Sequence, residues 1–252
     1  MSVQVRSCRN RRPIPICGMV LFRILMPNPA GSQLAFRAEK DLVAAMSTST
    51  QRLFSDEGSS CSLFREVQVY ATDLRIPDLV VVLHKSAGAP QQTLSYYEAA
   101  ILHALTQHGP IAAPELASEM FCMPVEVAKR LDKLERQRLV VKLGSRYSLN
   151  ARAFPIGVRV IAIEAKLREW KRAIKQACGY MSFANEAYIA MPERVVQRPQ
   201  VLEACEAASI GILSVHDSGK VTLLHRPTPS AVMSAEYLRL LSATVGLNQR
   251  SQ

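Results

Sequence analysis

Two short apolar stretches of the chain have the pattern of buried β-strands. Residues 76–83 read IPDLVVVL and residues 158–167 read VRVIAIEAKL. Both are rich in β-branched residues and bounded by loop-like sequence, which predicts two core strands. Each carries charge near one end, Asp78 in the first stretch and Glu164 and Lys166 in the second. Because side chains alternate along a strand, Glu164 and Lys166 are expected on the same face.

Helical periodicity dominates residues 95–150, the clearest unit of the chain. The apolar positions predict one helix that ends at Gly109-Pro110, a short second helix, and a third helix that begins at Pro124. A two-stranded hairpin with a Gly144 turn is expected to follow. The unit therefore predicts three helices and a hairpin.

This unit separates the Asp78 strand from the Glu164 strand, although the two strands look like partners. Without residues 88–153 they would be joined by a short link into an ordinary antiparallel hairpin. Insertion at an exposed hairpin tip is tolerated, because closing a longer loop costs little extra entropy. Residues 86–90 and 151–155 then serve as linkers. The expected domains are a leader (1–30), a core (31–87 and 154–252) and an inserted unit (88–153).

The core segments outside the insertion alternate between helix and strand patterns. The pattern predicts helices over 37–46, 168–184 and 199–209, and further strands over 64–70, 210–215 and 221–224. We therefore expect an α/β core, a mixed sheet flanked by helices, interrupted by an α+β unit.

The net charge of +10 and the pI near 9.6 favour an anionic partner. Half of that excess lies in residues 1–30, which we interpret as a disordered extension or an early start, with Met19 or Met26 as alternatives. Four further basic residues, Arg168, Lys171, Arg172 and Lys175, recur at helical spacing directly after the Glu164 strand. They suit phosphate contacts, or else a solvated helix face.

The cysteines and the hydropathy of the chain indicate its cellular compartment and bear on metal binding and membrane insertion. The six cysteines include no C-x-x-C pair and no spacing with histidine that suits a metal ligand set. This pattern is typical of a reducing compartment without zinc or an iron–sulfur cluster, and a cytoplasmic protein is expected. No apolar run approaches the length of a membrane span.

Three helices and a hairpin resemble a winged helix-turn-helix, similar to the MarR-type transcription regulators. The resemblance covers about 55 residues and implies that the helix from Pro124 enters the DNA major groove, with Lys129, Arg130 and Lys133 toward DNA. Arg146 on the hairpin would reach the minor groove. Winged helices also serve as protein-contact or dimerisation modules, and that alternative stays open.

The order of elements, with a literal P-D and E-x-K, resembles the PD-(D/E)xK restriction-endonuclease-like superfamily. Gln176 and Tyr180 match the Q-x-x-x-Y element of its RecB-like branch. The resemblance covers residues of about 31–87 and 154–226. It implies a Mg²⁺- or Mn²⁺-dependent DNA nuclease with a restriction-endonuclease-like fold.

The same resemblance implies a role for each matching residue. Asp78 and Glu164 would ligate the metal, and Lys166 would orient or deprotonate the attacking water. Glu39 would be the acid of the first helix, with Asp41 or Glu66 as alternatives, and Gln176 and Tyr180 would position phosphate or the 5′ strand. Inactive structural relatives exist in this superfamily. The alternative is a DNA-binding regulator that uses the core as a scaffold or as the platform of a homodimer.

Overall fold

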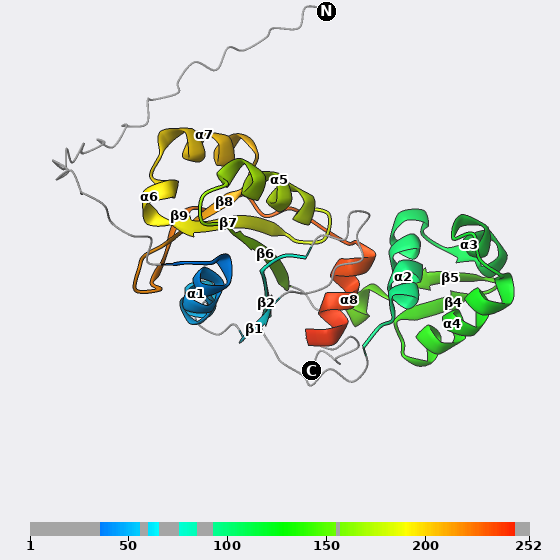
Figure 1. Cartoon of the computed structure of the whole chain (residues 1–252). Coiled ribbons are helices and arrows are strands. Elements are labelled where there is room, and N and C mark those ends of the chain that lie inside the picture. Colours follow the sequence, from blue (N-terminus) through cyan, green and yellow to red (C-terminus); the bar gives the residue numbers. More distant parts are fainter. Residues whose placement is uncertain (1–35, 56–59, 66–75, 85–92, 155–156, 245–252) are drawn as a thin grey trace, which may run out of the picture. The chain divides into compact units, whose positions relative to one another are not determined.

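The computed structural model describes residues 36–55, 60–65, 76–84, 93–154 and 157–244 (Figure 1). The expected leader over 1–30, the acidic alternative Glu66 and the linker over 86–90 lie outside these residues. Within the described ranges, no helix is both long enough and apolar enough to cross a membrane.

The core of the described chain is an α/β structure built on a six-stranded mixed sheet. The strand order is β1-β2-β6-β7-β8-β9. The strands are β1 (Ser60–Arg65), β2 (Leu79–His84), β6 (Arg159–Ala165), β7 (Glu186–Pro192), β8 (Gly211–Val215) and β9 (Val221–His225). Strands β6, β7 and β8 run parallel, whereas β1, β2 and β6 pair antiparallel, as do β8 and β9. The expected α/β class with a mixed sheet is confirmed.

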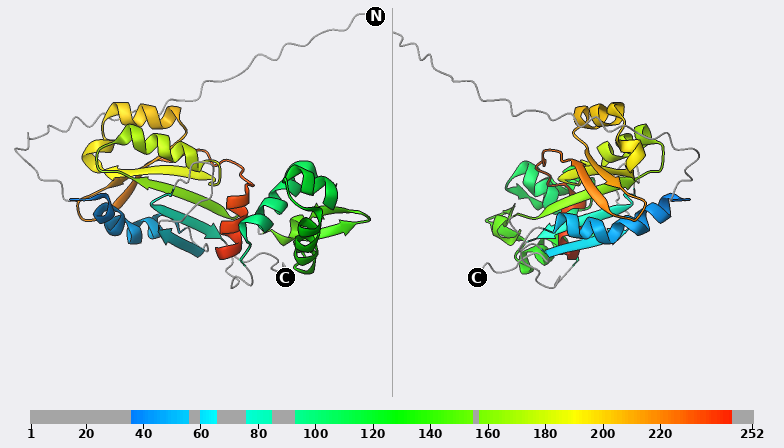
Figure 2. Two further views of the ribbon diagram at one scale, coloured as in Figure 1. Left: turned by 45° about the vertical axis from the view of Figure 1, so that its right-hand side comes forward. Right: turned by 90° about the vertical axis from the view of Figure 1, so that its left-hand side faces the viewer.

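Helices cover both faces of this sheet (Figures 1 and 2). Helix α1 (Glu39–Phe54) lies on one face, and α5 (Trp170–Tyr180), α6 (Glu193–Val196) and α7 (Pro199–Ala207) lie on the other. Side-chain alternation divides β2 between them: Leu79 and Val81 pack with α1, and Val80 and Val82 pack on the opposite face. Burial on both faces explains why β2 reads as a continuous apolar run.

The predicted pairing of the Asp78 and Glu164 strands is confirmed. Leu79 pairs with Ile163 and Leu83 with Arg159, in antiparallel register. Strand β2 begins at Leu79 rather than at residue 76, and Pro77, which has no N–H to donate to a ladder, precedes it. Strand β7, which joins the two halves of the sheet, was not predicted from the sequence.

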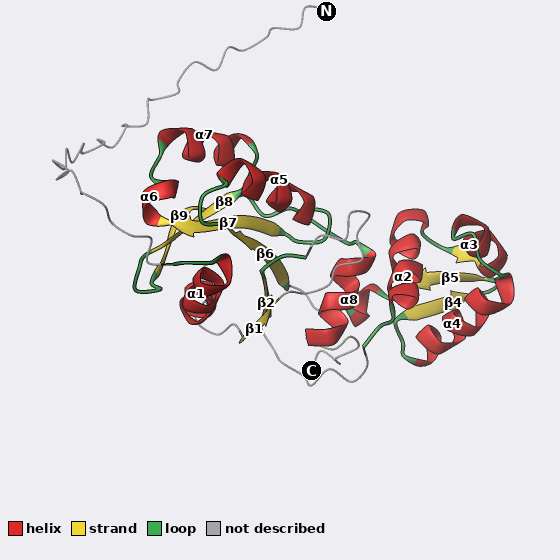
Figure 3. Cartoon of the chain, viewed as in Figure 1, coloured by secondary structure: helices red, strands yellow, loops and turns green. Residues whose placement is uncertain are grey.

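Residues 93–154, here called the three-helix module, lie between β2 and β6 in sequence and form their own small sheet (Figure 3). Its elements are α2 (Tyr96–His108), β3 (Ile111–Ala112), α3 (Ala113–Glu119), α4 (Pro124–Arg136), β4 (Val140–Leu143) and β5 (Arg146–Leu149), followed by a single 3₁₀ turn (Ala151–Ala153). The strand order is β3-β5-β4. Val127, Leu131 and Leu134 form the buried stripe of α4, as their spacing predicts.

Helix α8 (Ala235–Thr244), also missed by the sequence reasoning, packs against α2. The hydroxyl of Ser242 accepts a hydrogen bond from the backbone N–H of Leu94 at 3.0 Å. The hydroxyl of Tyr237 donates to the carbonyl of Val158 at 3.3 Å. Helix α8 therefore contacts both ends of the segment that separates β2 from β6.

Candidate active site

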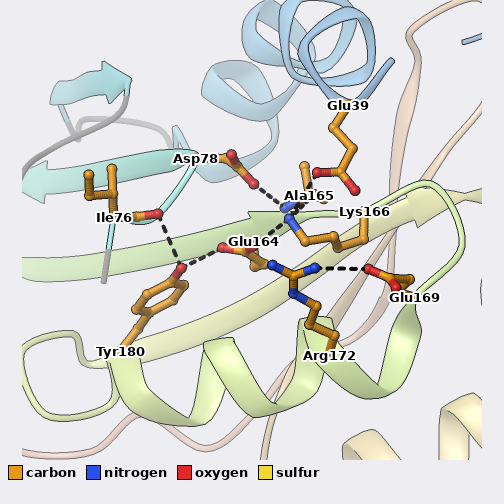
Figure 4. Close-up of polar contacts among 9 residues, drawn as sticks. All are labelled: Glu39, Ile76, Asp78, Glu164, Ala165, Lys166, Glu169, Arg172 and Tyr180. Atoms are coloured by element: carbon orange, nitrogen blue, oxygen red, sulfur yellow. Dashed lines mark hydrogen bonds and ion pairs between the residues drawn. The ribbon is translucent and has the colours of Figure 1, made fainter. Parts of the chain in front are cut away.

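Asp78 and Glu164 lie side by side where β2 begins and β6 ends (Figure 4). Asp78 directly precedes Leu79, and Glu164 directly follows its partner Ile163. The backbone N–H of Ala165 donates to Oδ2 of Asp78 at 2.7 Å, which fixes that carboxylate against β6. Antiparallel pairing therefore brings together two carboxylates that are 86 positions apart in sequence.

Lys166 links Glu164 to a third acid, Glu39. Its Nζ lies 2.7 Å from Oε1 of Glu164 and 3.0 Å from Oε2 of Glu39, and it donates to the carbonyl of Ala165 at 3.2 Å. The backbone N–H of Lys166 donates to Ala190 of β7 at 3.1 Å, so the residue continues the ladder beyond the end of β6. The amine is thus held by groups from α1 and β6 in a nearly buried position.

Glu39, rather than Asp41, is the α1 acid that reaches this cluster. Glu39 opens the helix, whereas Oδ2 of Asp41 accepts from the backbone N–H of Ala38 at 3.0 Å and caps it. Acidic residues at a helix N-terminus are favoured by the helix dipole. The sequence left open which of the two is the acid of this site; the structure places Glu39 against Lys166 and gives Asp41 a capping role.

Tyr180 closes the cluster from α5. Its hydroxyl donates to Oε2 of Glu164 and also lies within 3.3 Å of the Ile76 carbonyl oxygen. The ring is fully buried. Glu164 therefore meets an amine on one oxygen and a phenol on the other, as Figure 4 shows.

Gln176 lies one turn before Tyr180 on α5, as its spacing predicts. Its Oε1 atom is buried and has no hydrogen-bond partner within the described part of the chain. A buried acceptor without a donor is costly, because it has lost water and gained nothing in return. An incoming donor would remove that cost.

Burial and charge shift the pKa values of the two central groups. Burial raises the pKa of Glu164, the bonds from Lys166 and Tyr180 lower it, and the Asp78 carboxylate raises it further, with a net increase. Burial alone would lower the pKa of Lys166. The carboxylates of Glu164, Glu39 and Asp78 outweigh burial and raise it. Lys166 is therefore held as a cation.

The donor set suits a hard divalent cation only in part. Within the described ranges, no three Asp, Glu, His or Cys side chains form a group that could hold a metal. Two adjacent carboxylates, Asp78 and Glu164, remain, with the Ala165 carbonyl beside them. Mg²⁺ is commonly bound through one or two carboxylates and keeps several waters, so this oxygen set fits it chemically.

The basic residues near α5 are exposed and lie on or beside the helix that supplies Tyr180 to this cluster. Arg168 precedes the helix, and Lys171, Arg172 and Lys175 lie on its exposed side. The Nζ of Lys171 sits 5.4 Å from the centre of the Trp170 ring, and Arg172 pairs with the exposed Glu169 at 3.3 Å. Such exposed contacts are weak and easily exchanged.

The predicted DNA-contacting residues of the three-helix module are engaged within the module. Lys133 pairs with the buried carboxylate of Glu98, and the guanidinium of Arg130 lies 4.5 Å above the Tyr97 ring. Arg146 donates to the Pro110 carbonyl at 2.9 Å and to Glu115 at 3.3 Å. Lys129 pairs with Glu126 at 3.0 Å on the surface.

Sequence reasoning did not foresee the buried acid of this module. Glu98 completes a capping box with Ser95, whose backbone N–H donates to Oε2 at 2.9 Å. The S-x-x-E spacing before an apolar helix was a readable signal for this arrangement. Its partner Lys133, 35 residues away, carried no such signal.

Comparisons with known proteins found no matching family model, no matching curated protein and no matching solved structure.

Proposed function

We propose that the protein is a metal-dependent DNA nuclease that hydrolyses phosphodiester bonds, with a core of the PD-(D/E)xK type. The observation that carries this proposal is the cluster of Asp78, Glu164, Lys166, Glu39 and Tyr180 at the paired ends of β2 and β6. Acidic groups gathered at the edge of an apolar sheet are costly unless a cation joins them. A lysine beside two such acids suits phosphoester chemistry.

Asp78 and Glu164 are the residues that would hold Mg²⁺ or Mn²⁺. A bound divalent ion supplies positive charge at the phosphate and lowers the pKa of water. Lys166, whose pKa is raised, would steady the negative charge that develops on phosphorus rather than accept a proton. Glu39 would hold the amine in place, and the unpaired Oε1 of Gln176 would accept a hydrogen bond from substrate or its water.

The exposed basic residues next to α5 are the proposed main contacts to the DNA backbone. They lie on or beside the helix that supplies Tyr180 to the cluster, and two of them, Arg168 and Lys171, have no carboxylate partner among the described residues. The module between β2 and β6 is proposed to be an inserted winged helix-turn-helix, with Arg146 on its hairpin as the proposed DNA contact.

A nuclease assay tests this proposal. Purified protein is incubated with supercoiled and linear DNA in Mg²⁺, in Mn²⁺ and in EDTA. Glu164→Gln and Lys166→Met are expected to slow cutting by at least about 100-fold. Glu193→Gln and Lys220→Met, matched changes at exposed positions, should cut like the wild type. Undiminished cutting by Glu164→Gln and Lys166→Met would remove these residues from the reaction.

A second candidate is a non-catalytic DNA-binding regulator that retains the core as a scaffold. The observation that favours it is the internal neutralisation of Glu164, which already meets Lys166 and Tyr180. It predicts salt-dependent duplex binding that survives Asp78→Ala and no cutting in any divalent metal. Binding that requires Asp78 would count against it.

A further inference from the structure

The turn between α3 and α4 exposes large apolar side chains. Phe121 is 97% exposed, Met123 67% and Val125 56%, all within five consecutive residues. We call these three residues the turn patch. Isolated exposed apolar residues are ordinary on protein surfaces, but a group that includes a fully exposed phenylalanine marks an interaction site.

The backbone at Phe121 gives no reason for an aromatic residue there. Helix α3 ends with the Cys122 N–H donating to the Ala117 carbonyl at 2.9 Å and the Phe121 N–H donating to Ser118 at 3.2 Å. This arrangement puts Phe121 in the left-handed region, with φ of 51°, a position that glycine favours. Neither backbone preference nor burial among the described residues accounts for the phenyl ring, which favours a contact with a partner.

The charges beside the turn patch identify the kind of partner. Glu126 and Lys129 form an ion pair of 3.0 Å with both side chains at least half exposed, and Glu119 lies 3.9 Å from His108 on the other side. This neighbourhood has no positive surplus, so it does not attract a polyanion. One acid next to one base is self-complementary, which a two-fold interface between identical chains requires.

We propose that the turn patch is the contact surface for a second copy of this chain. In a two-fold interface the same patch lies on both sides, the Phe121 rings become buried, and Glu126 of each copy faces Lys129 of the other. This places self-association on the three-helix module, and leaves the basic residues near α5 accessible. The inference does not rest on the proposed nuclease activity.

Sedimentation velocity of the full chain over a wide concentration range tests the interface. The wild type is expected to form a dimer that dissociates on dilution. Phe121→Gly should weaken the dimer at least about tenfold. Its melting temperature, extrapolated to the monomer, should be unchanged or higher, because glycine suits the left-handed position and no buried surface is lost. Leu224→Asn, at a 43% exposed position on β9, is the control and should dimerise like the wild type.

A charge exchange sharpens the test. Glu126→Lys and Lys129→Glu should each weaken self-association, because each places like charges across the interface. Mixed together, the two variants should restore a dimer, since both cross-pairs become attractive. A monomeric wild type, a dimer that persists in Phe121→Gly, or a mixture that stays monomeric would each overturn the proposal.

Discussion

Two helices of the molecule carry basic residues at similar spacing, and the structure uses them differently. Near α5 of the core, the Lys171 ammonium lies over the partly buried Trp170 ring, and Arg172 pairs with the exposed Glu169. On α4 of the three-helix module, Lys133 reaches Glu98, whose side chain is 3% exposed. A cation that neutralises a buried acid is part of the fold, whereas a cation paired at the surface can exchange its partner for phosphate.

The contrast teaches that helical spacing locates a basic face but does not reveal its partner. Lys133 and Arg130 lie on α4 as the sequence predicts, yet both are engaged with residues of α2, Glu98 and Tyr97. No such acid from another element pairs with Lys171 or Arg172 among the described residues. Removal of basic residues should therefore mainly reduce stability on α4 and mainly reduce DNA binding near α5.

The largest expected difference is in stability. Lys133→Ala leaves the Glu98 carboxylate buried without its partner and should lower the free energy of unfolding by about 2 kcal/mol. Lys171→Ala, at an exposed position, should change it by less than about 0.5 kcal/mol. Urea unfolding of both variants at neutral pH measures the difference.

The double variant Lys133→Ala with Glu98→Gln identifies the cause. Removing the buried charge as well should recover part of the lost stability, because a neutral amide still accepts from the Ser95 N–H. Equal stability of Lys133→Ala and Lys171→Ala would show that the Glu98 contact is not part of the fold's support.

The next effect concerns DNA affinity. The double variant Arg168→Ala with Lys171→Ala should weaken duplex binding about tenfold and reduce the slope of log K against log salt by about 2. The matched double variant on α4, Lys129→Ala with Arg136→Ala, removes residues bonded to Glu126 and to the Asp132 carbonyl, and should have a smaller effect. Fluorescence anisotropy across a salt series compares the two. A larger loss of DNA affinity in the α4 double variant would show that the main DNA contact lies on the three-helix module.

Much of the fold could be predicted from local patterns, since β2 and β6 are mostly continuous apolar runs and the helices of the module show helical periodicity. Strand β7 could not, because EAYIAMP contains an acid at its start and a proline at its end. Its Glu186 is buried, but it pairs with Arg159 at 2.8 Å and accepts a hydrogen bond from the Tyr188 hydroxyl at 2.6 Å. Tertiary partners therefore made a strand of a sequence whose own pattern did not indicate one.

The part of the candidate site that depends on strand pairing and side-chain alternation could be predicted from the sequence. Pairing of two apolar strands places Asp78 beside Glu164, and alternation places Lys166 beside Glu164. The contact between Lys166 and Glu39 depends instead on how α1 crosses the sheet, which no local pattern determines. Backbone groups such as the Ala165 N–H and the Ile76 carbonyl carry no signal in the sequence at all.

The smallest expected effect compares two of the buried glutamates, Glu98 and Glu164, through pH. Burial raises the pKa of Glu98, but the Lys133 ammonium and the Ser95 bonds outweigh it, so the net shift is downward. Glu98 therefore stabilises the folded state above its unfolded pKa, and this contribution is lost as pH falls through the folded pKa. Burial raises the pKa of Glu164 with a net upward shift, so its ionised form disfavours folding at neutral pH and this penalty disappears in acid.

Glu98→Gln and Glu164→Gln should consequently have opposite signs. At neutral pH the first should lower the free energy of unfolding, and the second should raise it, because the amide removes the cost of burying an ionised carboxylate. Both differences from the wild type should shrink as the pH falls below the ordinary carboxyl range, because the wild-type carboxylates become neutral. Chemical unfolding at a series of pH values measures both. Loss of stability in Glu164→Gln at neutral pH would mean that the ion pair with Lys166 outweighs burial, and that the core acid supports the fold as Glu98 supports the module.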